Sequence, residues 1–308
     1  MPADGRSRSS AQPARIFVLK VLLTGADGFT GRHFISTAAA AGHEVVRLQA
    51  NLCDKASLTA EVAQIAPEAV VHLAAISFVG HANDSAFYTV NVVGTTNLLK
   101  ALVALPINPS KVLLASSANI YGNCNASPIE EAQPPAPLNH YAASKLAMEY
   151  MARTFAEKLP IVITRPFNYT GPGQMLNFVV PKIVDHFVRR APAIELGNLI
   201  VEREFNDVQM VCSTYLELLK HALPGEIYNV CTGQPYTLQV VIETLVQITG
   251  HQIEVQVNPS FIRANEVHHL CGSPNKLKAL LATHDAEFVN PPLANTLRRM
   301  LASAGLNY

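Results

Sequence analysis

The sequence carries little charge and no excess of either sign. Only 15% of its 308 residues are charged, and the 23 basic side chains equal the 23 acidic ones. A neutral chain lacks the broad basic face that attracts nucleic acid or an anionic membrane through its field alone. We therefore expect neither nucleic acid nor a membrane as a partner, and an anionic ligand must be held by local groups.

Closely spaced cysteines and long apolar runs are also missing. The five cysteines contain no C-x-x-C pair, which argues against a zinc site and a disulfide framework, so we expect no metal and reduced thiols. No run reaches the roughly 18 uninterrupted apolar residues that a membrane span needs. Residues 1–15 are partly basic but have no apolar core of a secretory signal. We expect a flexible leader over these residues and a cytoplasmic location.

Apolar residues are abundant, at 49% of the chain, and they recur in a regular order. Helical patterns separate apolar stretches that do not alternate with polar residues, namely IFVLKVLL, EVVRL, AVVHLAA, KVLLASS and PIVITRP. Strands of this kind are buried on both faces, as in a parallel sheet covered by helices. The sequence predicts an α/β fold with a doubly wound parallel Rossmann sheet. Its helices run from about Arg32 to Ala41, from about Ser85 to Leu105, and onward from near Tyr141.

The sequence pattern changes after Pro166, where glycine- and proline-containing loops alternate with shorter predicted elements. We expect residues 16–165 to form a dinucleotide-binding domain. Residues 166–204 and 234–308 are expected to form a smaller α/β substrate-binding lobe. The segment 205–233, with a helical stretch and the strand EIYNV, is expected to rejoin the first domain.

A glycine motif follows the first predicted strand. Gly25, Gly28 and Gly31 form G-x-x-G-x-x-G between a buried strand and the start of a helix. Glycines at these places let the backbone turn tightly and approach a pyrophosphate, which faces the amides of the helix N-terminus. The motif in this context predicts a dinucleotide site.

A second motif suits proton transfer. Tyr141 and Lys145 lie four residues apart, so on a helix they emerge side by side, and a nearby cation is expected to lower the pKa of the phenol. Ser116 and Ser117 follow the strand KVLLA, at the carboxyl edge where parallel sheets bind ligands. Together these residues predict general acid-base chemistry beside the dinucleotide.

The blocks TGADGFTG, HLAAISFV, NVVGT, SSANIYG, YAASK and RPFN, in this order and spacing, resemble the extended short-chain dehydrogenase/reductase family. The resemblance runs from about Val18 to Asn275. It implies a nicotinamide-dependent enzyme acting on a nucleotide-linked sugar, assembled as a homodimer. The blocks RPFNYTGPGQ, REFNDV, YNVCTGQ and RANEV are most similar to those of family members that reduce GDP-4-keto-6-deoxy-D-mannose.

The resemblance also implies roles for individual residues. Tyr141 matches the general acid/base, Lys145 the ribose-binding lysine, and Ser117 the hydroxyl that holds the substrate oxygen. The remaining cofactor contacts that it implies are Gly25, Gly28, Phe29, Gly31, Asn51, Leu52, Ala74, Ala75 and Asn91. The remaining substrate contacts are Ser77, Ser116, Asn168, Arg203, Arg263 and Glu266.

Two departures bear on the reaction. Dehydratases of the family have carboxylates directly after the catalytic Ser or Thr position, where this chain has Ala118 and Asn119. Reductases that also epimerise C3 and C5 have a Cys at the position of Asn119. The remaining Ser, Tyr and Lys suffice for ketoreduction, so we expect GDP-4-keto-6-deoxy-D-mannose to be reduced to GDP-D-rhamnose. A nucleotide-sugar 4-epimerase with the same three residues and a non-catalytic NAD(P)-binding regulator stay open as alternatives.

The cofactor choice rests on the end of the second strand. NAD enzymes usually place an acid there to accept the ribose hydroxyls, but EVVRLQAN has none after Glu44. Arg47 or Arg32 is available to meet a 2′-phosphate. We therefore favour NADP(H), with NAD(H) as the alternative. His140 stands where the family often has Pro before the tyrosine, and we assign it no proton-transfer role.

Overall fold

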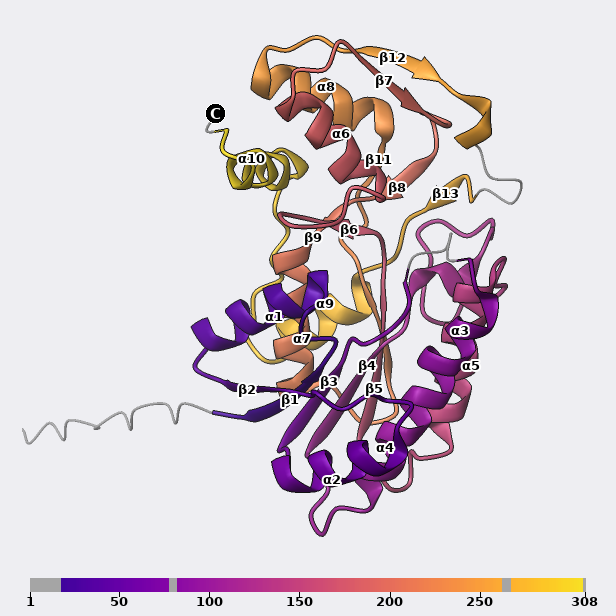
Figure 1. The fold of residues 1–308 in the computed structure, drawn as a ribbon, viewed down its shortest axis with the longest axis vertical. Coiled ribbons are helices and arrows are strands. Elements are labelled where there is room, and N and C mark those ends of the chain that lie inside the picture. Colours follow the sequence, from indigo (N-terminus) through magenta and orange to yellow (C-terminus); the bar gives the residue numbers. More distant parts are fainter. Residues whose placement is uncertain (1–17, 78–81, 262–266, 307–308) are drawn as a thin grey trace, which may run out of the picture.

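The computed structural model describes residues 18–77, 82–261 and 267–306. The leader expected over residues 1–15 lies outside the described residues. A helix-covered sheet forms the larger part of the molecule, and a smaller lobe sits beyond one end of its strands (Figure 1). Among the helices of the described ranges, none has the length and apolar character that crossing a membrane requires.

A six-stranded parallel sheet lies at the centre, in the order β10-β5-β4-β3-β1-β2. Its strands are β1 (Lys20–Thr24), β2 (Glu44–Arg47), β3 (Ala69–His72), β4 (Lys111–Ala115), β5 (Ile161–Pro166) and β10 (Ile227–Val230). The chain order reverses between β1 and β3, and open parallel sheets bind ligands at the carboxyl edge beside such a switch point. The doubly wound parallel sheet expected from the sequence is confirmed.

Helices cover both faces of this sheet, which explains why its strands are continuously apolar. One face carries α1 (Phe29–Ala40), α7 (Val208–His221) and α9 (Asn275–Ala282). The other carries α2 (Lys55–Ile65), α4 (Thr95–Val103) and α5 (His140–Arg153). The segment 205–233 thus contributes a covering helix and an edge strand to the sheet. The helix α9 also packs against the sheet, although residues 234–308 were expected to belong to the lobe.

The long helix expected from about Ser85 to Leu105 is interrupted. The structure has α3 (Asp84–Tyr88), a π-helical turn η1 (Thr89–Gly94) and then α4. Within the wide turn, the side chain of Asn91 accepts a hydrogen bond from the backbone of Ile76 at 3.0 Å. It also donates to Ser144 Oγ at 3.0 Å, so the turn connects the loop after β3 to α5. Widened turns of this kind occur frequently at functional sites.

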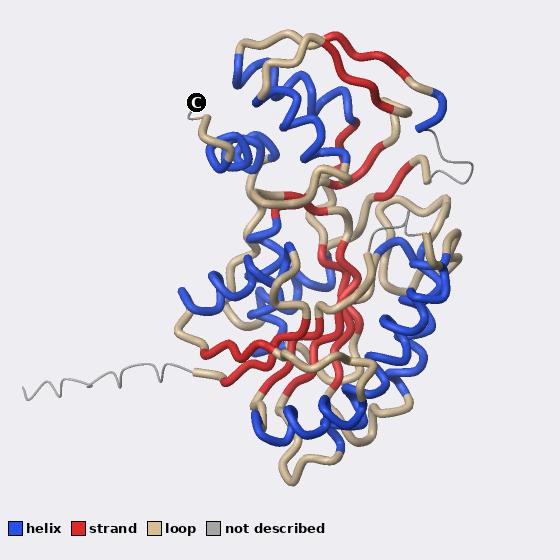
Figure 2. The backbone as a smooth tube through the Cα atoms, in the orientation of Figure 1, coloured by secondary structure: helices blue, strands red, loops and turns tan. Residues whose placement is uncertain are grey.

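The lobe has its own apolar core among α6 (Val179–Val188), α8 (Leu238–Thr249) and α10 (Leu293–Ser303). Its strands are β7 (Ala193–Leu196) with β12 (Glu254–Val257), and β8 (Glu202–Glu204) with β11 (Pro235–Thr237) and β13 (His269–Leu270). Where the chain crosses between the two parts, β6 (Tyr169–Thr170) pairs in parallel with β9 (Asn206–Asp207). Figure 2 shows the chain passing between the sheet and the lobe in this region.

Candidate active site

A cavity of about 370 Å³ lies at the carboxyl ends of β1, β3, β4 and β5. The cavity brings together residues predicted to contact the cofactor and residues predicted to contact the substrate. The predicted site residues that line it are Gly25, Gly28, Phe29, Gly31, Ala74, Ala75, Ser77, Ser116, Ser117, Tyr141, Lys145 and Asn168.

The glycine loop between β1 and α1 forms one wall of the cavity and is closely packed. Gly25 has a φ of +70°, and a Cβ there would lie 2.7 Å from the backbone nitrogen of Ala74. A Cβ at Gly31 would lie 2.2 Å from the carbonyl oxygen of Gly25. The helix α1 begins without a side-chain cap at Gly28 and without an acid in its first turn. Its N-terminal amides and dipole therefore suit the pyrophosphate of a dinucleotide.

The helix α5 presents Tyr141 and Lys145 to the same cavity. Asn139 caps this helix by accepting a hydrogen bond from the backbone of Ala142 at 2.9 Å, which fixes where the helix begins. Both side chains are buried, and Tyr141 shares a hydrogen bond with Ser117. Lys145 Nζ donates to the carbonyl oxygen of Ala115 at 2.7 Å. The helix and the end of β4 thus hold the three proposed catalytic groups together.

Burial governs the acidity of these groups. It raises the pKa of the Tyr141 phenol, and the hydrogen bond with Ser117 acts in the opposite direction. Burial lowers the pKa of Lys145 to about 8, while the carboxylate of Glu149 opposes that shift. The expectation that Lys145 lowers the pKa of Tyr141 is wrong for this structure, because burial dominates and Ser117 supplies the lowering contribution. The phenol consequently holds its proton at neutral pH.

Ser116 offers a further polar group to a ligand. Its side chain is buried, lines the cavity, and its Oγ has no hydrogen-bond partner among the described residues. A buried hydroxyl without a partner costs free energy, so a polar ligand in the cavity would satisfy it. This hydroxyl, the glycine wall and Lys145 together fit a dinucleotide cofactor.

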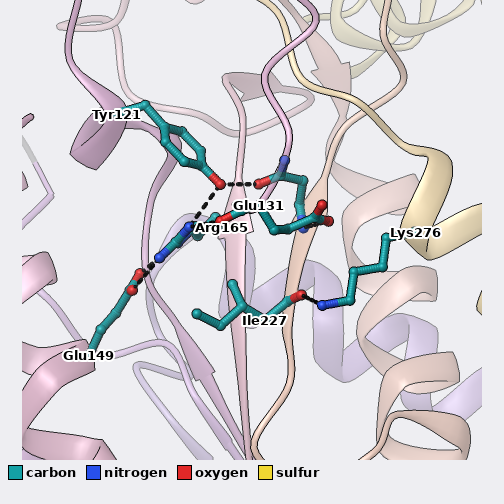
Figure 3. Close-up of polar contacts among 7 residues, drawn as sticks. Tyr121, Glu131, Glu149, Arg165, Ile227 and Lys276 are labelled. Atoms are coloured by element: carbon teal, nitrogen blue, oxygen red, sulfur yellow. Dashed lines mark hydrogen bonds and ion pairs between the residues drawn. The ribbon is translucent and has the colours of Figure 1, made fainter. Parts of the chain in front are cut away.

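A buried polar network supports the catalytic helix from behind (Figure 3). Arg165 on β5 binds Glu149 on α5, with Nη2 and Oε2 2.7 Å apart, and also donates to the Tyr121 hydroxyl at 2.9 Å. The Tyr121 hydroxyl donates in turn to Asn229 on β10 at 2.7 Å. Burial raises the pKa of Tyr121 to about 12, so it stays a neutral donor. The network joins α5, β5 and β10 just outside the cavity.

The two arginines expected at the cofactor lie at the rim. Arg32 Nη1 donates to the carbonyl oxygen of Asp27 at 2.7 Å, and Arg47 Nη1 lies 3.5 Å from Asp27 Oδ1. Both guanidinium groups are thus within reach of one residue of the glycine loop, although neither arginine lines the cavity.

Four other predicted contacts also lie outside the cavity lining. Asn51 accepts a hydrogen bond from the backbone of Cys53, and Leu52 is buried. Asn91 forms hydrogen bonds with Ile76 and Ser144, so it connects the loop after β3 to α5. Arg203 donates to the carbonyl oxygen of Glu202 at 2.8 Å and to that of Val267. Arg263 and Glu266 lie outside the described residues.

His140 is directed away from the chemistry. Its Nδ1 lies 3.0 Å from the Tyr88 hydroxyl and its Nε2 lies 3.4 Å from Asp84 Oδ2, both on α3. The side chain is 54% exposed, and His140 does not line the cavity. The structure therefore gives this residue a contact between α3 and α5.

Several lining residues were not selected from the sequence. They are Thr30, Leu73, Ala115, Ala118, Asn119, Pro166, Phe167, Tyr169, Gln174, Met175, Phe178 and Leu270. Thr30 and Tyr169 stand directly beside recognised motifs, so their neighbourhood was the available signal. Met175 and Phe178 come from a loop of the lobe, whose approach to the cavity depends on tertiary packing.

Comparison with known proteins agrees with this geometry. The family model described as GDP-mannose 4,6 dehydratase matches residues 47–282. A GDP-6-deoxy-D-talose 4-dehydrogenase of Aggregatibacter actinomycetemcomitans is 35% identical over 85% of this chain and 91% of its own length. A GDP-6-deoxy-D-mannose reductase of Pseudomonas aeruginosa is 35% identical over 84% of this chain and 89% of its own length.

Solved structures share the whole architecture. RMD from Pseudomonas aeruginosa, complexed with NADPH, matches with a TM-score of 0.83 and 33% identity over 93% of this chain and 97% of that one. A protein of Burkholderia cenocepacia J2315, described provisionally as an epimerase, matches with a TM-score of 0.86 and 44% identity over 92% and 97% of the two chains.

The fold and the relatives define an NAD(P)-dependent oxidoreductase of the extended short-chain dehydrogenase/reductase type. Within that class, the chain belongs to the GDP-mannose 4,6 dehydratase family.

Proposed function

We propose that this enzyme reduces the C4 ketone of a GDP-linked 4-keto-6-deoxy sugar, with GDP-4-keto-6-deoxy-D-mannose as substrate and GDP-D-rhamnose as product. A bound nicotinamide supplies the hydride. Tyr141 donates its phenolic proton to the ketone oxygen, and Ser117 orients that oxygen through its hydroxyl. Lys145 holds the cofactor ribose.

The chemistry of the cavity wall carries this proposal. Among its described lining residues there is no Asp, Glu, His or Cys, so Tyr141 is the proton donor best placed for a ketone. Ala118 and Asn119 line the wall where a dehydratase would have its acidic pair. Neither side chain can exchange a proton in the working pH range. This site therefore lacks the acid and base that elimination of water would need, although the family model that matches the chain carries the name of a dehydratase.

The sugar is inferred from the relatives. The names of the two 35% identical enzymes specify GDP-linked 6-deoxy sugars that differ in configuration at C4. Both sugars are related by oxidation at C4 to the same 4-keto compound. The face of the ketone that receives the hydride then decides between them, and the RPFN, REF and RANE sequence blocks favour the rhamnose product.

We propose NADP(H) as the preferred cofactor. Arg32 and Arg47 both contact Asp27 in the glycine loop, so two guanidinium groups and one carboxylate lie together beside the end of β2. Glu61 is the acid near this strand end, and its carboxylate accepts hydrogen bonds from the backbone of Gln49 and Ala50, at 2.8 and 2.6 Å. The Glu61 carboxylate is therefore engaged. The guanidinium groups of Arg32 and Arg47 lie close to the expected position of a 2′-phosphate, and their positive charge suits it.

A 4-epimerase is the second candidate, favoured by the 44% identity to the Burkholderia cenocepacia protein. It would use the same Ser117, Tyr141 and Lys145 without net consumption of cofactor. Two incubations separate the activities: NADPH with a panel of GDP-, dTDP- and UDP-linked 4-keto sugars tests reduction, and the corresponding 4-hydroxy sugars with oxidised cofactor test epimerisation. A reductase oxidises one NADPH per GDP-linked 4-keto sugar converted. No NADPH oxidation with any 4-keto sugar, together with inversion at C4 of a 4-hydroxy sugar without net change of the cofactor, would disprove reductase activity.

A further inference from the structure

Tyr169 connects the two halves of the cavity. It directly follows Asn168, the proposed substrate contact, and its hydroxyl lies 2.8 Å from Thr30 Oγ1 in the first turn of α1. Its ring stacks on Phe29 of the same turn, with centroids 6.1 Å apart and planes 15° from parallel. The Tyr169 side chain thus joins β6, which leads into the lobe, to the start of α1, where the pyrophosphate is proposed to bind.

Two more hydrogen bonds join the same two segments. His33 Nε2 lies 2.8 Å from the carbonyl oxygen of Pro172, and Arg32 Nη2 donates to the carbonyl oxygen of Gly173 at 3.2 Å. The two segments are also in van der Waals reach of each other, because a Cβ at Gly171 would lie 3.7 Å from the Phe29 ring. The first two turns of α1 therefore hold the loop that follows β6.

The backbone beside Tyr169 is held independently of its side chain. Asn206 donates to the carbonyl oxygen of Asn168 from its backbone nitrogen at 2.9 Å and from its side chain at 3.2 Å. Gln174 Nε2 donates to the carbonyl oxygen of Tyr169 at 3.3 Å. Asn206 and Gln174 therefore brace the backbone of Asn168 and Tyr169, while the Tyr169 hydroxyl contacts Thr30.

We propose that Tyr169 is a positioning residue, which through Thr30 couples cofactor binding at the glycine loop to the placement of Asn168 and of the loop 171–178. The inference rests on the proposed function, in which NADP(H) and a nucleotide sugar share this cavity. A dinucleotide fixes the first turn of α1 by binding its amides. The hydrogen bond from that turn to Tyr169 then orders the segment that receives the sugar.

The test compares three variants with the wild type. Tyr169→Phe keeps the stacked ring and removes the hydroxyl, while Thr30→Val removes its partner with little change of shape. Thr37→Val is the matched control on the same helix, because its hydroxyl donates to the carbonyl oxygen of His33 within α1. Hydrogen exchange of peptides covering residues 169–178 is measured with and without NADPH, together with the NADPH Kd and the steady-state constants for the keto sugar.

NADPH is expected to slow exchange over residues 169–178 in the wild type and in Thr37→Val. In Tyr169→Phe and Thr30→Val this protection is reduced, because the bonds from His33 and Arg32 to the loop remain. The NADPH Kd stays within about twofold of the wild type, which is less than one typical hydrogen bond contributes. The KM for the keto sugar rises by about 2- to 10-fold, as expected for one hydrogen bond, and kcat is unchanged. Combining the two substitutions adds nothing further, because both remove the same bond.

Equal protection by NADPH in the wild type and in Tyr169→Phe would overturn the proposal. So would a wild type whose loop shows no NADPH-dependent protection. If Tyr169→Phe raises KM as strongly in the Thr30→Val background as in the wild type, the phenol acts on the sugar directly and the coupling is wrong. Failure of the proposed function is distinguishable, since the wild type would then not reduce the keto sugar while the exchange experiment still reports the coupling.

Discussion

Two hydrogen bonds, of 3.0 and 2.7 Å, join the guanidinium of Arg165 on β5 to the carboxylate of Glu149 on α5. Both side chains are buried, with 3% and 2% of their areas exposed. Glu149 lies one turn after Lys145, and Arg165 directly precedes the segment that leads to Asn168. The ion pair therefore fixes α5, which carries Tyr141 and Lys145, relative to the segment that carries Asn168.

Breaking this pair is expected to destabilise the fold. Arg165→Met leaves the Glu149 carboxylate buried without its partner, so the free energy of unfolding should fall by about 3–5 kcal/mol in urea titrations. Arg189→Met, which breaks an exposed pair with Asp185, is the control and should cost about 0–1 kcal/mol. Removing both charges, as in Arg165→Met with Glu149→Met, should recover most of the loss. If Arg165→Met lowers the free energy of unfolding no more than Arg189→Met does, the buried pair does not stabilise the fold as proposed.

Tyr141→Phe should separate chemistry from binding. The ring stays, so packing and NADPH affinity are preserved, but the proton donor is gone. General acid catalysis contributes about 10²–10⁴-fold, and kcat should fall by that range. Lys145→Met should in addition weaken NADPH binding, because it removes the ribose contact. If the Tyr141→Phe enzyme retains more than about a tenth of wild-type turnover, another group must donate the proton.

The pKa of Lys145 predicts a pH limit for cofactor binding. Because burial lowers this pKa to about 8, the ammonium of the free enzyme loses its charge as the pH rises through that value. The Kd for NADPH should then increase by about tenfold for each pH unit above it. Fluorescence titration with NADPH between pH 6.5 and about 9.5 measures this dependence, with Lys145→Met as the control that should lack it. A wild-type Kd that is constant across the range would contradict the assignment.

The same shift makes a prediction for stability. The folded pKa of Lys145 lies below 10.5, the ordinary pKa of a lysine, so the folded state binds fewer protons between those two values. The free energy of unfolding of the wild type, relative to Lys145→Met, should therefore rise as the pH increases from about 8 towards 10.5. Urea titrations of both proteins across this interval test the sign, and a relative stability that falls with pH would contradict it.

Arg47→Ser tests the cofactor preference. Removal of one charged contact to a 2′-phosphate should lower kcat/KM for NADPH by about 10- to 100-fold and leave the value for NADH nearly unchanged. Lys100→Ser removes an exposed cation from the last turn of α4 and should affect neither cofactor. Comparable efficiency of the wild type with NADH and NADPH would remove the argument for NADP(H).

Local motifs made the fold and the centre of the site predictable. The glycine spacing after a buried strand, and the four-residue spacing of Tyr141 and Lys145, are set by the backbone within one element. The rest depends on packing between elements. The attachment of α9 to the sheet, the contribution of Met175 to the cavity, and the pKa of Tyr141 follow from burial by distant segments, which no local pattern encodes.

Hydride delivery to C4 of the sugar can be followed directly by transfer of an isotopic label. A single turnover of GDP-4-keto-6-deoxy-D-mannose with NADPH deuterated on the transferring face of its nicotinamide is followed by NMR of the product. We expect GDP-D-rhamnose with one deuterium at C4 for each NADPH oxidised. A product without deuterium at C4, deuterium at another carbon, or conversion without NADPH oxidation would contradict it.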